Sequence, residues 1–242
     1  MCIRDRADAV VTVHEPYRRA LVARGTPAEK ITVVLNSPEE SLLPPPTPAP
    51  SAAGFRIVYH GTVTPHYGLE TLVEAFARIT DRIPDATVEI YGGGDALEQV
   101  KRRAENLGVE GRMHFSDGFL NNAEVLRRIQ GASVGVVANL AIARNQTALP
   151  TKLLEYVAMG IPVVASDLDA VREHFDDSEI EYFRAGDPQS LADAFIAISE
   201  SPAAAAARAA RAQVRYEGYR WPVYAERYVD LLRSLVDKPA QS

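Results

Sequence analysis

Short apolar segments alternate with helical segments along almost the whole chain, and this alternation most restricts the fold. Eight segments are apolar and bounded by turn residues, as expected of strands: 9–13, 31–35, 55–60, 86–91, 112–115, 133–138, 161–166 and 180–183. Several are continuous Val/Ile runs, typical of parallel strands covered on both faces. Between them apolar residues recur with the 3.6-residue helical period. The sequence therefore predicts an α/β fold with a Rossmann-like, doubly wound parallel sheet.

A proline-rich stretch, residues 44–50, interrupts this alternation. Proline cannot join a helix interior or a central strand, and proline-rich stretches act as stiff spacers. We therefore predict four parts: the remnant of a first domain at 1–40, a linker at 41–53, a complete domain at 54–215 and a C-terminal helix at 216–236. Because the first strand follows Met1 so closely, we expect the chain to begin inside a larger protein. A genuine short N-terminus stays open as the alternative.

Composition excludes several classes of protein. With 47% hydrophobic residues, the 242-residue chain can build a sizeable core. The net charge of −6 and the lack of a basic stripe argue against nucleic-acid binding. The only cysteine, Cys2, excludes an internal disulfide and fits a reducing, cytoplasmic compartment. No apolar run approaches the roughly 20 residues of a membrane span, which leaves a peripheral membrane contact open.

Residues 149–164 carry the strongest functional signal, since they read as a loop, an amphipathic helix, a glycine stop and a buried strand. Glu155 lies early in the predicted helix, where its carboxylate can accept hydrogen bonds from sugar hydroxyls. The free N–H groups of the first helical turn can hold a phosphate. The segment thus offers both halves of a nucleotide-sugar site. Two plainer interpretations stay open: a solvated Glu155, or an ion pair with Lys152 three residues earlier.

Two glycine-containing turns, 59–68 and 91–95, each follow a predicted strand and precede a helix. Ligands bind at the carboxyl ends of strands in open parallel sheets, and helix N-termini attract anions. The second turn does not complete the G-x-G-x-x-G dinucleotide pattern, because its sixth position is Leu97. Both turns also fit ordinary strand-to-helix connections, which need glycine for geometry alone.

Other catalytic patterns are missing. The five histidines are scattered without metal-binding spacing, so we predict no metal site. No G-x-S-x-G elbow is present, which argues against a serine hydrolase. His60 and His66 flank the first glycine turn and could meet a ligand, although each alone is more often structural. No catalytic residue can be named from these patterns.

In their order and spacing, these segments resemble the donor-binding C-terminal half of a retaining glycosyltransferase of the GT-B fold, of the group 1 (family 4) type. The resemblance covers almost the whole chain and is carried chiefly by 55–76, by 150–166 and by Tyr219-Arg220-Trp221 before the last helix. It implies transfer of a sugar from a nucleotide-diphosphate donor, a substrate rather than a cofactor, to a glycan or lipid-linked acceptor. The acceptor would be recognised by the missing N-terminal domain. We therefore expect these 242 residues to bind a nucleotide sugar weakly without transferring the sugar.

The resemblance also implies roles for particular residues. Those expected to line the donor diphosphate are Gly61, Thr62 and Gly68. Glu155 matches the family's ribose-binding glutamate, and Thr151 and Lys152 fall where phosphate or sugar is met. Those expected around the base are Tyr91, Gly92 and Phe119.

Three departures from the family pattern matter. Thr62 and Tyr67 stand where an arginine and a lysine are usual, and Thr147 stands where the first of two glutamates is expected. Our hypothesis is that Lys152, His66 or Arg144 supplies the missing positive charge. Unchanged donor affinity in a Lys152→Ala protein would count against Lys152.

Two alternatives remain from other classes of protein. One is a catalytically silent partner that keeps the fold and binds a nucleotide or a protein. The other is a Rossmann-type oxidoreductase or a nucleotide-sugar epimerase. The broken glycine pattern disfavours the oxidoreductase, and epimer formation without an acceptor would favour the epimerase.

Overall fold

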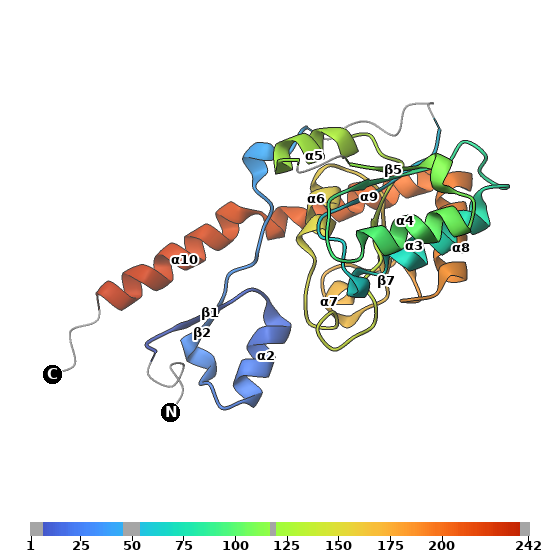
Figure 1. Ribbon diagram of the computed structural model, residues 1–242. Helices are drawn as coiled ribbons and strands as arrows, with labels where there is room; N and C mark the ends of the chain where they lie inside the picture. Colours follow the sequence, from blue (N-terminus) through green and yellow to red (C-terminus); the bar gives the residue numbers. More distant parts are fainter. Residues whose placement is uncertain (1–6, 46–53, 117–119, 238–242) are drawn as a thin grey trace. The chain divides into compact units, whose positions relative to one another are not determined.

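The computed structural model describes residues 7–45, 54–116 and 120–237 (Figure 1). The chain divides into two compact units. Unit 1 joins Met1–Glu40 with Glu217–Ser242, and unit 2 is Ser41–Tyr216.

Unit 2 is built on a six-stranded parallel sheet with the order β5-β4-β3-β6-β7-β8. Its strands are β3 (Arg56–His60), β4 (Thr87–Tyr91), β5 (Met113–Phe115), β6 (Val134–Val137), β7 (Val163–Ser166) and β8 (Glu181–Phe183). From β3 the chain adds strands first in one direction and then, starting at β6, in the other. This is the doubly wound topology that the alternation of segments predicted. Its strand order reverses between β3 and β6, where such sheets bind ligands.

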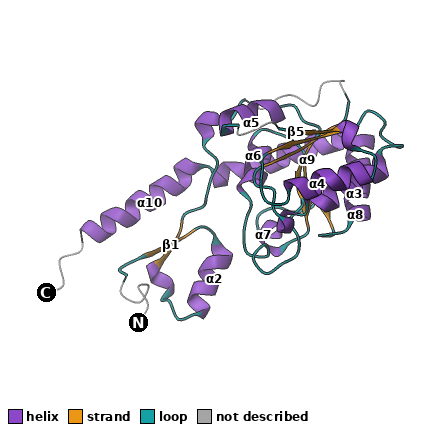
Figure 2. Ribbon diagram, viewed as in Figure 1, coloured by secondary structure: helices purple, strands orange, loops and turns teal. Residues whose placement is uncertain are grey.

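Helices cover both faces of this sheet (Figures 1 and 2). The main helices are α3 (Leu69–Ile79), α4 (Leu97–Asn106), α5 (Asn122–Ile129), α6 (Thr151–Ala158), α8 (Pro188–Glu200) and α9 (Pro202–Tyr216), with a short α7 (Asp169–Arg172). Ile57 and Tyr59 of β3 pack into one core with the apolar stripes of α3, α4 and α8. His60 faces Tyr156 of α6 on the other side, and the Tyr156 hydroxyl also lies within hydrogen-bonding distance of the Val58 carbonyl. Strand alternation thus directs His60 away from the core and toward α6.

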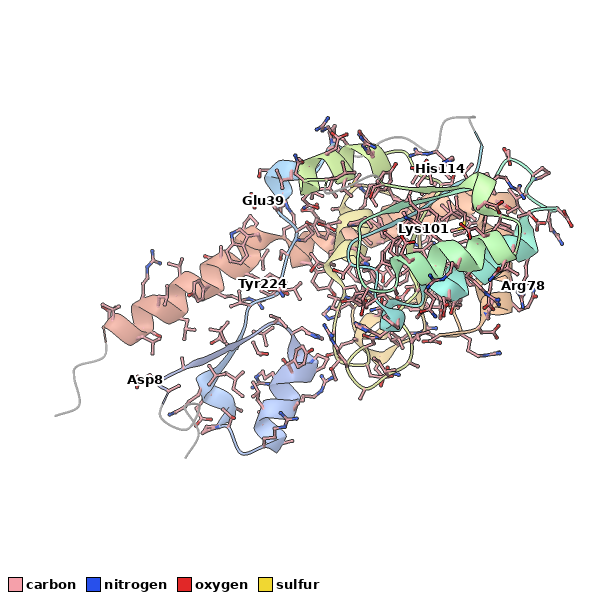
Figure 3. All side chains as sticks on the ribbon, in the orientation of Figure 1. Asp8, Glu39, Arg78, Lys101, His114 and Tyr224 are labelled. Atoms are coloured by element: carbon pink, nitrogen blue, oxygen red, sulfur yellow. The ribbon has the colours of Figure 1, made fainter. Side chains whose placement is uncertain are left out.

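Unit 1 is a smaller α/β assembly. Its parallel strands β1 (Val10–Thr12) and β2 (Ile31–Val33) are joined through α2 (Glu15–Ala23). The last helix, α10 (Trp221–Val236), belongs to the same unit, and Tyr224 is its buried residue (Figure 3). Arg220, just before α10, forms an ion pair with Glu40 at 2.7 Å.

All eight predicted strands are present, and each is one or two residues shorter than predicted at one or both ends. The strand predicted at 9–13 is Val10–Thr12, for example. The predicted helical stripes and the last helix are confirmed as well. Among the helices of the described residues, none is both long enough and apolar enough to span a membrane.

Candidate functional site

The loops that follow β3, β4 and β5 are hydrogen-bonded to one another and form one wall of the site. Gly61 N–H donates to the Tyr91 carbonyl at 2.9 Å, and Val63 N–H donates to the Gly93 carbonyl at 2.9 Å. Gly92 N–H in turn donates to the Ser116 hydroxyl at 3.1 Å. These bonds hold the two predicted glycine turns side by side at the carboxyl ends of their strands.

Gly92 is required for this approach. Its φ of +151° lies in a region that favours glycine, and a Cβ built there would lie 2.0 Å from the Gly61 carbonyl oxygen. Any larger residue at position 92 would push the two turns apart.

The opposite wall comes from the loop between β6 and α6 and from the first turn of α6. The His66 carbonyl accepts hydrogen bonds from Leu140 N–H and from the buried Asn145 side chain, both at 3.0 Å. Asn145 Nδ2 also donates to the Leu140 carbonyl at 2.8 Å. The long loop is thereby fixed to the first glycine turn, and α6 begins after Pro150 with no side chain capping its free N–H groups.

Two neighbouring cavities border the first glycine turn, and the second wall contributes to one of them. The α6 cavity, of about 410 Å³, is bordered by the first glycine turn, the loop before α6 and the first turns of α6. The glycine-turn cavity, of about 670 Å³, is bordered by both glycine turns and the start of α5. Four residues line both cavities: His60, Gly61, Thr62 and Asn122. A single extended ligand can therefore occupy both.

Lys152 brings an unpaired amine into the α6 cavity. Its stem is partly exposed, but its Nζ is buried and has no hydrogen-bond partner among the described residues. The Nζ lies 3.8 Å from the centre of the Tyr59 ring and 5.1 Å from that of Tyr67. Burial lowers the pKa of this amine to about 7, although the nearby Glu155 carboxylate raises it. An anion that enters the cavity would raise the pKa of this amine, so that the amine takes up a proton and pairs with the anion.

Asn139 lines the same cavity and has an unused acceptor. It follows β6, is 3% exposed, and its buried Oδ1 has no hydrogen-bond partner in the described part of the chain. An unpaired buried donor and an unpaired buried acceptor in one cavity are costly, and they mark a place where a polar ligand can bind.

Glu155 is buried and held by His60. Its Oε2 lies 2.6 Å from His60 Nε2, and the two residues are 7% and 5% exposed. Burial raises the pKa of Glu155, but hydrogen bonds from His60 and Asn122 and the nearby Lys152 outweigh this effect, so the pKa lies below its ordinary value. The carboxylate therefore stays ionised and acts only as an acceptor.

The structure brings together most of the predicted site residues. Those lining one or both cavities are Gly61, Thr62, Tyr91, Gly92, Thr151, Lys152 and Glu155. His66 and Gly68 line neither cavity: the His66 ring contacts Thr64 Oγ1 at 3.1 Å, and Gly68 precedes α3. Phe119 lies outside the described residues.

Both plainer interpretations of Glu155 are wrong. The side chain is not solvated, and its carboxylate pairs with His60 rather than with Lys152. Of the candidates for positive charge, Lys152 and Arg144 line the α6 cavity and His66 does not.

Three asparagines of the site were missed: Asn122, Asn139 and Asn145. Asn139 carried a usable signal, because a polar residue directly after a buried strand lies at the ligand-binding edge of a parallel sheet. Thr147, at the position of the absent glutamate, does not line either cavity, and its hydroxyl donates to the Arg144 carbonyl at 3.2 Å. Within the described ranges, no group of three or more His, Cys, Asp or Glu side chains is placed to hold a metal ion.

Comparisons with known proteins agree with this geometry. A family model described as glycosyl transferases group 1 matches residues 54–201. The phosphatidyl-myo-inositol mannosyltransferase of Mycobacterium tuberculosis is 28% identical over 182 residues, which cover 73% of this chain and 46% of that protein. The chain thus spans about half the length of the curated relatives it matches.

Solved structures share the fold. Anabaena HepE, crystallised with UDP and glucose, matches with a TM-score of 0.78 and 19% identity over 94% of this chain and 64% of that one. Sucrose-phosphate synthase from Thermosynechococcus elongatus matches with a TM-score of 0.78 and 21% identity over 97% of this chain and 60% of that one.

Proposed function

Because this chain belongs to the group 1 glycosyltransferases, we propose that it binds a nucleotide-diphosphate sugar as the donor-binding half of a retaining GT-B enzyme. The enzyme transfers the sugar to a glycan or glycolipid acceptor, which is recognised outside these residues. The sugar nucleotide is a substrate, and neither a cofactor nor a metal enters the proposal.

The observation that carries this proposal is the unpaired Lys152 amine beside the first turn of α6. In our assignment the donor diphosphate lies in the α6 cavity, between Lys152 and the free N–H groups of α6, with Gly61 and Thr62 on the opposite wall. A helix N-terminus and a buried cation attract the same anion. The cation comes from α6 and so replaces the arginine and lysine that the family usually carries in the glycine turn.

The nucleoside is assigned to the glycine-turn cavity. Tyr91 and Gly92 face the base there, with Phe119 expected nearby. The Tyr91 hydroxyl donates to Glu89 at 2.8 Å, which orients its ring, and burial raises its pKa to about 12. Glu155, at the border of the α6 cavity, accepts the ribose hydroxyls.

The chemistry of this half is electrostatic. Holding the diphosphate stabilises the charge that develops on the leaving group, and the bound donor presents its sugar to the acceptor. HepE was crystallised with UDP and glucose, and the mycobacterial relative is named for a phosphatidylinositol acceptor. On that basis we assign the protein to polysaccharide or cell-envelope synthesis, in the cytoplasm with peripheral contact at the inner face of the membrane.

Calorimetric titration tests the proposal. The probes are UDP, GDP, ADP and CMP, each compared with its nucleoside. We expect one diphosphate to bind much more tightly than its nucleoside, and Lys152→Met to weaken it by about 10- to 100-fold, as for a lost charged hydrogen bond. Lys101→Met is the control, because Lys101 pairs with Glu98 on α4 and lines neither cavity; the side chain is labelled in Figure 3. Failure of the wild-type chain to bind any of these nucleotides would refute the proposal.

Thr147 favours a second candidate, a nucleotide-binding protein of this fold without transferase activity. The family's first glutamate is absent at this position. None of the loop residues that line the α6 cavity is a glutamate. The two candidates share the binding site and differ in turnover. Hydrolysis or transfer of the sugar by the protein under saturating donor and acceptor would exclude the silent candidate.

A further inference from the structure

His60 is fixed from both sides of its ring. It is the last residue of β3, and its Nε2 lies 2.6 Å from Glu155 Oε2 while its Nδ1 lies 3.0 Å from the Tyr156 hydroxyl. The imidazole and the Tyr156 ring meet edge to face, with centroids 4.9 Å apart. Rotation of the imidazole would break two buried hydrogen bonds at once.

The hydrogen bonds of the Tyr156 hydroxyl are compatible with a proton on His60 Nε2 that points at Glu155. This oxygen also accepts from His60 N–H at 3.2 Å and lies 3.4 Å from the Val58 carbonyl. When the hydroxyl donates to Nδ1, the ring proton must lie on Nε2. When it donates to the Val58 carbonyl instead, a proton on Nδ1 can point at its oxygen while Nε2 stays protonated. A bare Nε2 would face an ionised carboxylate, so Nε2 is the donor in both arrangements.

Room for Tyr156 is made by Gly135 of β6. A Cβ at this position would lie 2.5 Å from the Tyr156 ring, so the ring rests directly on the strand backbone. The local sequence thus builds one continuous support, from β6 through Tyr156 and His60 to the Glu155 carboxylate.

Glu155 retains acceptor capacity after these contacts. An ionised carboxylate offers about four acceptor positions. His60 takes one and Asn122 another. The remaining positions require donors, and a pair of neighbouring hydroxyls supplies two. A carboxylate held in one orientation discriminates strongly against an analogue that lacks one of these hydroxyls.

We infer that His60 is a positioning residue that orients Glu155 toward the ribose diol and so sets a preference for ribonucleotides over 2′-deoxyribonucleotides. The inference rests on the proposed function, since it takes the nucleoside to lie beside Glu155. His60 lines the α6 cavity, but both of its ring nitrogens are taken up by Glu155 and Tyr156, so its removal should change ribose discrimination more than it changes pyrophosphate affinity.

The test measures dissociation constants for UDP, GDP and their 2′-deoxy counterparts, with inorganic pyrophosphate as the reference anion. The proteins are the wild type, His60→Gln, which keeps a side-chain N–H donor, and His60→Leu, which has none. We expect the wild type to bind a ribonucleotide at least about tenfold more tightly than its 2′-deoxy form. The ratio should stay within about threefold of the wild-type value in His60→Gln and fall toward one in His60→Leu. Pyrophosphate affinity serves as the internal reference, and in His60→Leu it should change by a smaller factor than the ratio does.

Tyr156→Phe is the second variant, in case His60→Leu does not fold. It keeps the ring on β6 but removes the hydroxyl that holds Nδ1, and we expect it to lower the ratio by about threefold. A folded His60→Leu protein that keeps the full ribose preference would overturn the inference. If that variant does not fold, a full preference in Tyr156→Phe would overturn it instead. A wild-type ratio near one would also overturn it. In those cases diphosphate binding, and with it the proposed function, would stand. A wild type that binds no nucleotide would overturn both.

Discussion

Replacing Lys152 by methionine should make the free protein more stable while weakening its affinity for nucleoside diphosphates. In the structure the Lys152 Nζ is buried without a hydrogen-bond partner, above the Tyr59 ring. Methionine has a similar length and keeps the apolar stem in place, so the change removes the amine with little repacking. The amine is expected to destabilise the free protein and to contribute favourably only when an anion is bound.

The size of the effect follows from the pKa of Lys152. Its value of about 7 in the folded protein, against 10.5 as the ordinary value, means that the folded state binds fewer protons between these limits. Linkage then gives a penalty of about 4 kcal/mol at pH 7, which falls to about 1 kcal/mol at pH 10 as the unfolded lysine also loses its proton. The contact with the Tyr59 ring returns about 0.5–2 kcal/mol. The net gain expected for Lys152→Met at pH 7 is therefore about 2–4 kcal/mol.

Urea unfolding followed by circular dichroism measures this gain, at pH 7 and again at pH 10. The corresponding rise in Tm at pH 7 is about 4–16 °C, given about 2–4 °C per kcal/mol for a protein of this size. The sign is distinctive, because the penalty from Lys152 shrinks as pH rises in this window, so the stability difference between the variant and the wild type should shrink with it. A variant that is no more stable than wild type at pH 7, or a gain that is equal at pH 7 and pH 10, would show that the amine is not desolvated as described.

Three further predictions follow from the same contacts. A bound diphosphate raises the pKa of Lys152, so binding at pH 8 should take up protons and nucleotide affinity should fall from pH 7 to pH 9. Calorimetry in two buffers of different ionisation enthalpy measures the proton uptake, and an uptake of zero would contradict this prediction. Gly135→Ala should destabilise the protein by about 1–3 kcal/mol, since its Cβ meets the Tyr156 ring, whereas Gly111→Ala, where a Cβ meets nothing within 4 Å, should be neutral in urea unfolding. A Tyr67→Lys/Lys152→Met protein, which moves the cation to the opposite wall of the α6 cavity, should recover diphosphate affinity relative to Lys152→Met alone; no recovery in the titration would mean that Lys152 does more than supply charge.

The fold could be predicted almost entirely from local sequence. Segments 133–138 and 161–166 are short and mostly apolar, and this composition favours a strand covered on both faces. The helical stripe through Leu69 and Phe76 is equally clear, because its period matches one buried helix face. Strand ends were less certain, since the terminal residues of an apolar run need not pair with a neighbouring strand.

The site could be predicted only in part. Gly61, Thr151 and Glu155 each lie next to a local signal, a strand end or a helix start. The partner of Glu155 gave no such signal, because His60 is 95 positions away in the sequence and meets it only when β3 and α6 lie side by side. The i,i+3 spacing along α6 favoured Lys152 as the ion-pair partner of Glu155. In the structure the Lys152 amine lies over the ring of Tyr59 instead.

The departures from the family pattern are linked rather than independent. Where the family usually has a lysine in the glycine turn, this chain has Tyr67, and the Tyr67 ring lies near the amine that Lys152 brings from α6. A tyrosine at this position would leave the diphosphate without a cation if the cation had to come from the glycine turn. Beside a lysine from the opposite wall it becomes part of the cation's surroundings, together with Tyr59. The positive charge thus reaches the same cavity from another element. On the proposed assignment, this donor site takes its cation from Lys152 at the first turn of α6, with Tyr59 and Tyr67 as its aromatic neighbours.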